Sequence, residues 1–125
     1  MGAGQLFFTS VCVEVLSWVR YRFEHLRRWW EYAERVARAA KDLPPGAEVY
    51  VIGGVAEGRV TVLSDIDALV AVPGGTPSSE ELKRLPVDIL LRAVDLYGRP
   101  VEVHVADART LKLYGKTCRV AVRVG

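Results

Sequence analysis

Two acidic residues stand one position apart inside an apolar run, in the string GGVAEGRVTVLSDIDALVAV that covers residues 53–72. They are Asp65 and Asp67, and ten residues separate them from a preceding glycine pair, Gly53 and Gly54. If the run is a strand, side-chain alternation points both carboxylates the same way, roughly 7 Å apart. Because bare buried charge is costly and like charges repel, such a pair calls for a cation or an exposed strand edge.

The residue types of this stretch suit a metal ion and a phosphate chain. Mg²⁺ prefers oxygen ligands, accepts one or two carboxylates, and keeps its other positions for water and substrate phosphates. A glycine pair after a strand lets the backbone approach a ligand closely and aim its N–H groups at it. If a helical turn begins near Val55, its N-terminal end adds a positive dipole that favours phosphate. The glycines and the aspartates therefore predict the two halves of a nucleoside-triphosphate site.

Alternating helical and extended patterns must position these residues. Apolar residues recur at three- and four-residue steps from about residue 11 to 41, which predicts one long helix after a weakly specified lead-in. Residues 7–15 also fit a strand. Prolines end that helix, and runs of β-branched residues bounded by glycine or proline predict strands. We expect strands at 48–52, 61–72, 101–105 and 118–124, a glycine turn at 53–58, and further helices at 78–84, 87–97 and 108–114.

This order of elements predicts an α/β (α+β) fold with a mixed β-sheet of four to five strands flanked by helices. We expect a single domain over residues 1–125, with an N-terminal helical segment at 1–46 and a sheet core that carries the motif at 47–125. In the strand at 101–105, alternation points Glu102 and His104 to one layer and the three valines to the other.

The long helix carries more aromatic residues than one apolar stripe can hold. The stripe contains Val15, Trp18, Val19, Phe23, Leu26, Trp30, Ala33, Ala37 and Ala40. Tyr21, Trp29 and Tyr32 fall partly off it. These three either pack on the N-terminal segment and the domain edge, or form an exposed patch for a partner or a second copy.

The composition indicates a globular protein without a membrane span. Half of the 125 residues are hydrophobic and 26% are charged, and the net charge of +2 is too small to indicate direct nucleic-acid binding. The first residues lack the features of a signal peptide, so we expect a cytoplasmic location. Thirteen arginines against four lysines, with no Asn, suit a thermophilic source. Cys12 and Cys118 are read as buried thiols, and a disulfide between them stays open.

The glycines, the spacing and the acidic pair together resemble the signature of the DNA polymerase β-like nucleotidyltransferase superfamily. The strings GGVAEG, from Gly53, and SDIDALV, from Ser64, are most similar to its minimal nucleotidyltransferases. Those are small archaeal and bacterial proteins, often encoded beside a partner with a HEPN domain. The resemblance covers about half of the chain, from Val49 to about Ala106. An Asp-x-Asp pattern alone is more often a solvated strand edge, but with the glycines, the spacing and the strand context it is fairly specific.

The resemblance implies transfer of a nucleoside monophosphate from a nucleoside triphosphate, ATP being the expected donor, to a hydroxyl group of an acceptor. It implies Mg²⁺ or Mn²⁺ as cofactor, held by the catalytic residues Asp65, Asp67 and Glu102. Glu102 would also activate the acceptor hydroxyl, with His104 beside it. Contacts with the nucleotide are implied for Gly53, Gly54 and Ser64.

Three functions follow from this resemblance. The first is an antitoxin-type enzyme that adds adenylyl groups to a HEPN ribonuclease and silences it. The second is a catalytically weak or inactive module that neutralises its partner by contact. This alternative is motivated by Glu102, where the family more often has Asp, and by Glu57, where many relatives have a basic residue. The third is a stand-alone enzyme that modifies a small molecule. The expected partner is a HEPN-domain protein or further copies of this chain.

Overall fold

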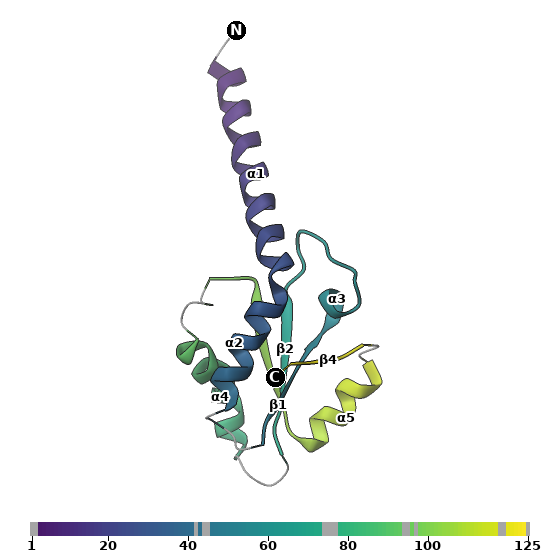
Figure 1. Cartoon of the computed structure of the whole chain (residues 1–125). Coiled ribbons are helices and arrows are strands. Elements are labelled where there is room, and N and C mark those ends of the chain that lie inside the picture. The colour runs from purple at the N-terminus through teal and green to yellow at the C-terminus, as the bar shows by residue number, and fades with distance from the viewer. Residues whose placement is uncertain are drawn as a thin grey trace.

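A four-stranded mixed sheet forms the centre of the computed structural model, which describes residues 3–41, 43, 46–73, 78–93, 96, 98–117 and 120–124. Its strands, in the order β3-β2-β1-β4, are β1 (Glu48–Ile52), β2 (Ile66–Ala71), β3 (Val101–Ala106) and β4 (Val122–Val124). The helices are α1 (Ala3–Arg27), α2 (Trp29–Lys41), α3 (Gly53–Ala56), α4 (Ser79–Arg92) and α5 (Ala108–Thr117) (Figure 1). β1 is antiparallel to β2 and β4, whereas β2 is parallel to β3. The predicted α+β domain with a mixed sheet is therefore confirmed.

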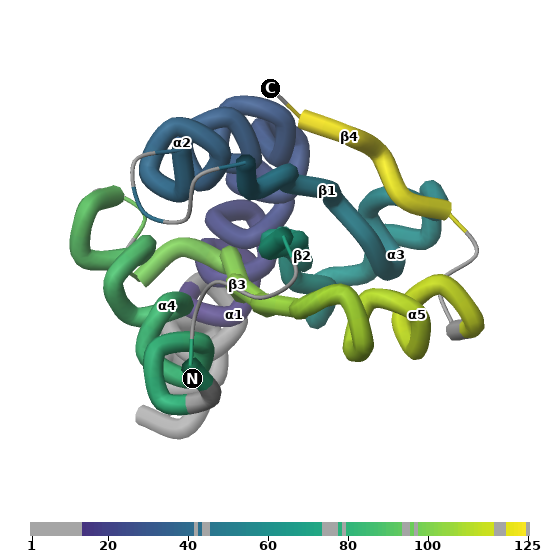
Figure 2. Tube along the Cα trace, turned by 90° about the horizontal axis from the view of Figure 1, so that it is seen from below, coloured from purple at the N-terminus to yellow at the C-terminus, as the bar shows by residue number. Residues whose placement is uncertain are grey.

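The two faces of the sheet are covered unequally. Helices α2 and α4 pack on one face, and α5 lies on the other side (Figure 2). The face under α2 and α4 carries the main core, in which Val51, Ile66 and Val70 are fully buried. The opposite face carries only a small apolar cluster around Ile52 and Leu69. Polar side chains on that second face can therefore remain accessible.

The predicted single helix at 11–41 is in fact two helices that meet at Arg28. The Arg28 N–H donates to the carbonyl oxygen of His25 at 3.0 Å, which is the tighter i−3 pattern of a turn. The helical phase changes at this point, so Tyr32 is buried whereas Trp30 is 42% exposed. The predicted stripe was wrong for these two aromatic residues. The start was also wrong, because α1 already begins at Ala3.

Helix α1 extends away from the sheet, as Figure 1 shows. Its Val15, Leu16 and Trp18 side chains are exposed, although the stripe placed Val15 and Trp18 in the core. Leu26, near the end of the helix, is buried as predicted. Within the described part of the chain, no helix combines the length and the apolar character needed to cross a bilayer.

Helix α4 is continuous, although two helices were predicted around Pro86. The Ser78 hydroxyl accepts a hydrogen bond from the Glu81 N–H at 3.3 Å and caps the start of the helix, as expected. An internal proline costs a helix about 3 kcal/mol. Burial of Leu85 and Ile89 against the core offsets that cost, so packing overrides the local signal.

The ends of two further elements differ from the predictions. Gly115 was expected to close the helix at 108–114, but α5 continues through it to residue 117. The last strand is also shorter than predicted and begins at Val122. Cys118 and the side chain of Cys12 lie outside the described residues, so the expectation for the thiols stays a prediction.

The junction of α1 and α2 encloses a buried histidine, His25. Its Nε2 accepts a hydrogen bond from the Arg99 guanidinium at 2.8 Å, so Nδ1 carries the ring proton and donates to the hydroxyl of Tyr32. The Tyr21 hydroxyl donates to the carbonyl of Gly98 at 3.2 Å. These bonds tie both helices to the segment that leads into β3.

The free energy of unfolding should fall as the pH drops below 6.5. Burial, followed by the charges of Arg99 and Arg28, lowers the pKa of His25 below its ordinary 6.5. The unfolded chain then binds the proton more readily than the folded chain. The His25 contribution is therefore complete above pH 6.5 and is lost as the pH falls toward the folded pKa, by at most about 1.4 kcal/mol per pH unit.

Urea denaturation from about pH 8 to about pH 5 measures this dependence. His25→Gln should flatten the slope below pH 6.5, because the substituted side chain does not titrate. At about pH 8 the imidazole is neutral in both states, so that end of the series is the control. An equal slope in wild type and in His25→Gln would refute the prediction.

Candidate active site

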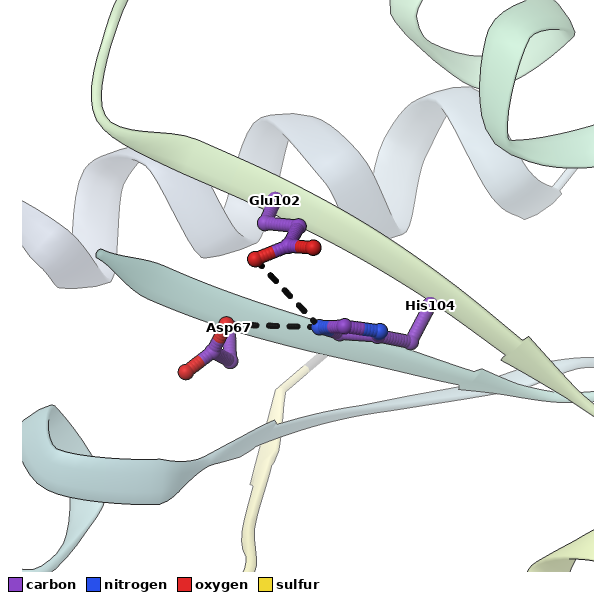
Figure 3. Close-up of side chains that lie close together, drawn as sticks. All are labelled: Asp67, Glu102 and His104. Carbon is purple, nitrogen blue, oxygen red and sulfur yellow. Dashed lines mark hydrogen bonds and ion pairs between the residues drawn. The ribbon is translucent and has the colours of Figure 1, made fainter.

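Asp67, Glu102 and His104 lie together on the less covered face of the sheet (Figure 3). The parallel pairing of β2 with β3 places Asp67 opposite Glu102 and Leu69 opposite His104. Nε2 of His104 lies 3.3 Å from Oδ1 of Asp67 and 3.8 Å from Oε2 of Glu102. One ligand atom from each of the three lies within 4.8 Å of the others, so they could share one cation.

This cluster is open to solvent on one side. The side chains of Asp67 and His104 are 26% and 29% exposed, and that of Glu102 is 58% exposed. A small ligand can therefore reach all three. Contact with the sheet also removes part of the water around Asp67, which strengthens its interaction with a bound charge.

The absence of a side chain at Gly53 leaves space for the Asp67 carboxylate. β1 ends opposite Asp67, at Ile52, and the chain turns there into α3 with a φ of +77° at Gly53. A Cβ atom at this position would lie 2.6 Å from Oδ2 of Asp67. The backbone conformation therefore favours glycine, and any Cβ at this position would force the Asp67 carboxylate to move. The predicted helical turn within residues 53–58 is confirmed as α3.

Gly54 lies where the turn after β1 closes on itself. The Arg59 N–H donates to the carbonyl oxygen of Gly54 at 2.8 Å, and a Cβ on Gly54 would lie 2.8 Å from the carbonyl oxygen of Arg59. The Glu57 carboxylate in the same turn pairs with the Arg59 guanidinium. The negative charge of Glu57 is thus partly neutralised within the turn.

Asp65 does not share a strand with Asp67, in contrast to the prediction. β2 begins only at Ile66, and Asp65 precedes it. Arg22 of α1 holds this segment, because its guanidinium lies 3.1 Å from Oδ1 of Asp65 and donates to the carbonyl oxygen of Ser64 at 2.7 Å. Asp65 is thus paired with a cation from a distant part of the chain.

The Ser64 side chain helps to shape the turn before β2. Its hydroxyl oxygen accepts a hydrogen bond from the Thr61 N–H at 2.8 Å, and its N–H donates to the Thr61 carbonyl at 3.0 Å. This turn is the reason that residues 61–65 are not part of the strand, which was predicted to start at 61. The predicted contact of Ser64 with a nucleotide remains a prediction.

Arg22→Met should lower the free energy of unfolding by about 1.5–3 kcal/mol, the usual range for hydrogen bonds to a charged group. The Arg22 side chain is only 18% exposed, and it binds two backbone carbonyls, those of Val62 and Ser64, besides Asp65. Urea denaturation measures the loss. Arg20→Met is the matched control, because Arg20 is exposed on the same helix. Equal losses in the two variants would contradict the role assigned to Arg22.

The sequence prediction included Asp67 and Glu102 and named His104 only as a neighbour of Glu102. It missed Arg22, because an arginine on a helix has no local signal that distinguishes a partly buried side chain with a distant partner from a solvated one. The structure brings Asp67, Glu102 and His104 together and places Asp65 with Arg22 instead.

Comparisons with known proteins identify a family and a similar fold. The model of the Nucleotidyltransferase domain family matches residues 33–118. A solved structure described as a "putative nucleotidyltransferase" from Sulfolobus solfataricus superimposes with a TM-score of 0.52 at 21% identity, over 82% of this chain and 85% of the other. A second, described in the same words, gives a TM-score of 0.49 at 23% identity, over 76% and 95%. No curated protein matches the chain.

The family match covers more than half of the chain and contains the whole region from β1 to β3. The first structural likeness adds agreement in fold. Gly53, Asp67 and Glu102 all lie inside the matched region. The chain therefore belongs to the nucleotidyltransferase domain family of the DNA polymerase β-like superfamily.

Proposed function

We propose that the protein is a metal-dependent nucleotidyltransferase that transfers a nucleoside monophosphate from a nucleoside triphosphate, with ATP as the favoured donor, to an acceptor hydroxyl. The observation that carries this proposal is the pairing of Asp67 with Glu102 across β2 and β3, beside the Gly53 turn, within a domain of this family.

The donor atoms of the cluster fit a divalent cation. Carboxylate oxygens are the ligands that Mg²⁺ prefers, and those of Asp67 and Glu102 approach within the 4.8 Å of the cluster. These two residues would hold Mg²⁺ or Mn²⁺, and Asp65 would join them once its carboxylate leaves Arg22. When bound, such a cation neutralises phosphate charge and stabilises the departing pyrophosphate.

Residues of the chain would carry out the proton transfer and bind the phosphates. Glu102, whose side chain is 58% exposed, would accept the proton of the acceptor hydroxyl as a general base. The hydroxyl oxygen would attack the α-phosphorus in line as the bond to pyrophosphate breaks. Backbone N–H groups of Gly53 and Gly54 would face the phosphates, and the hydroxyl hydrogen of Ser64 would be donated to a phosphate oxygen.

An apolar cavity on the same sheet face supports binding of the nucleoside. Its volume is about 210 Å³, and its lining includes Tyr50, Ile52, Leu69 and Tyr114. Leu69 is two residues along β2 from Asp67, so the cavity neighbours the cluster. Aromatic and aliphatic side chains of this kind pack against a flat base.

We further propose that the acceptor is a HEPN-domain ribonuclease, silenced by adenylyl groups. The exposed Val15, Leu16 and Trp18 side chains of α1 support a protein partner. The same surface would equally serve the alternative in which the chain neutralises its partner by contact alone. The ion pair of Glu57 with Arg59 favours the active enzyme, because it weakens the repulsion between Glu57 and a triphosphate.

Two measurements test these proposals. Calorimetric titration with ATP should give binding that requires Mg²⁺, and a wild-type protein that binds no nucleotide with Mg²⁺ present would overturn the enzymatic function. Incubation with ATP labelled at the α-phosphate should then label a HEPN-domain protein added as acceptor. Nucleotide binding without any label transfer would favour the contact-only module, and label on small molecules alone would favour the stand-alone enzyme.

A further inference from the structure

We propose that His104 is itself a ligand of the cation, and that its nitrogen makes the site prefer a first-row transition metal over Mg²⁺. The inference rests on the proposed function, because it assumes that the carboxylates of Asp67 and Glu102 bind the cation. It adds a nitrogen ligand, and with it a preference between Mg²⁺ and Mn²⁺, that the three-carboxylate set of Asp65, Asp67 and Glu102 does not give.

The positions of the donor atoms carry the inference. Ligand atoms bound to one such ion at about 2.0–2.2 Å lie about 3–3.5 Å from each other. Nε2 of His104 lies 3.3 Å from Oδ1 of Asp67, where the ring N–H donates to the carboxylate. This distance is within that range, so a cation would take the place of the shared proton. Its distance of 3.8 Å to Oε2 of Glu102 is slightly longer, and the flexible, mostly exposed Glu102 side chain can close the difference. In Figure 3 the His104 ring points its nitrogen at both carboxylates.

The chemistry of the donor set favours a metal that accepts nitrogen. Mg²⁺ binds through oxygen and demands near-ideal octahedral geometry. Imidazole ligands favour the later first-row metals, and affinity for a mixed site generally rises from Mn²⁺ toward Zn²⁺ and Cu²⁺. The third carboxylate that would complete an all-oxygen set, Asp65, is paired with Arg22. The described cluster thus offers two carboxylates and one imidazole nitrogen.

The assignment can be read spectroscopically, because the chain has only two histidines, His25 and His104. His25 is buried, and both of its ring nitrogens are occupied by Tyr32 and Arg99. A histidine nitrogen detected on a bound metal must therefore come from His104.

Pulsed electron paramagnetic resonance of the protein with Mn²⁺ tests the inference. Wild type should show the coupling of a directly bound imidazole nitrogen, and His104→Gln should lose it. The dissociation constant for Mn²⁺ should rise at least about tenfold in His104→Gln, because even residues that only support metal ligands contribute that much. Mg²⁺ affinity, measured by competition, should change by less than about threefold. His104→Glu, with an oxygen donor of similar reach, should keep Mn²⁺ binding without the nitrogen signal.

The outcomes separate this inference from the proposed function. Mn²⁺ bound through Asp67 without nitrogen coupling would overturn the role of His104 and leave the carboxylate site intact. Absence of both Mn²⁺ and Mg²⁺ binding in wild type would overturn both. If His104→Gln fails to fold by circular dichroism, the nitrogen signal of wild type together with its loss in His104→Glu still decides the question.

Discussion

Asp67→Asn should lower metal-dependent release of pyrophosphate from ATP at least about 100-fold. Asparagine keeps the size of the side chain but removes its charge and one carboxylate oxygen from the cluster with Glu102 and His104. The fold should survive, because Asp67 is partly exposed and its strand is anchored by buried neighbours such as Ile66 and Ala68. The rate of pyrophosphate release, Mn²⁺ affinity and thermal denaturation measure these three effects.

Two further variants test whether the loss is specific to the Asp67 carboxylate. Asp88→Asn is the matched control, because Asp88 is exposed on α4 away from the cluster, and it should keep the wild-type rate. Asp65→Asn tests whether this carboxylate leaves Arg22 for the cation. A loss of Mn²⁺ binding comparable to that of Asp67→Asn would place Asp65 in the site, whereas reduced stability alone would place it with Arg22. An Asp67→Asn rate within about threefold of wild type would refute the assignment of Asp67 as a metal ligand.

Gly53→Ala should damage the site and the fold together. Its φ of +77° is unfavourable for any residue with a Cβ, by about 1–2 kcal/mol. The new methyl group would also lie 2.6 Å from Oδ2 of Asp67 and displace that carboxylate. We expect a corresponding loss in the free energy of unfolding and a Mn²⁺ affinity reduced at least about tenfold.

Gly58→Ala is the control for this variant. Gly58 has nearly the same φ, +74°, but a Cβ there would meet nothing within 4 Å. Both variants should therefore show similar destabilisation in urea, and only Gly53→Ala should lose metal affinity. Equal Mn²⁺ affinities in the two variants would refute the claim that a Cβ at position 53 displaces the Asp67 carboxylate and weakens metal binding.

The strands β1 and β3 could be predicted well because their signals are local. Glu48–Ile52 was predicted with its observed boundaries, since a β-branched run lies there between a proline–glycine turn and the glycine pair. Alternation alone placed Glu102 and His104 on one side of β3. The helices were harder, because the turn at Arg28 and the continuity of α4 through Pro86 depend on packing against the sheet.

The position of Asp65 could not be predicted for a different reason. The apolar run around it reads as one strand from residue 61, yet the turn of Thr61 and Ser64 delays the strand to Ile66. Arg22, which holds that segment, is 43 residues away from Asp65 in the chain. A contact between residues so distant produces no periodic pattern in the sequence. The position of Asp65 before the strand could therefore be seen only in the structure.

The register in which β2 pairs with β3 also determines where the carboxylates of the site lie. Neighbouring residues of a strand point to opposite faces, so a slip of one position would turn Asp67 into the core and Ile66 toward solvent. Such a slip would expose apolar residues that are now fully buried, among them Ala68 and Val70. The hydrophobic pattern that fixes the register therefore also fixes which carboxylates face each other. Substitutions that preserve this hydrophobic pattern should therefore also preserve the register that places residue 67 opposite residue 102.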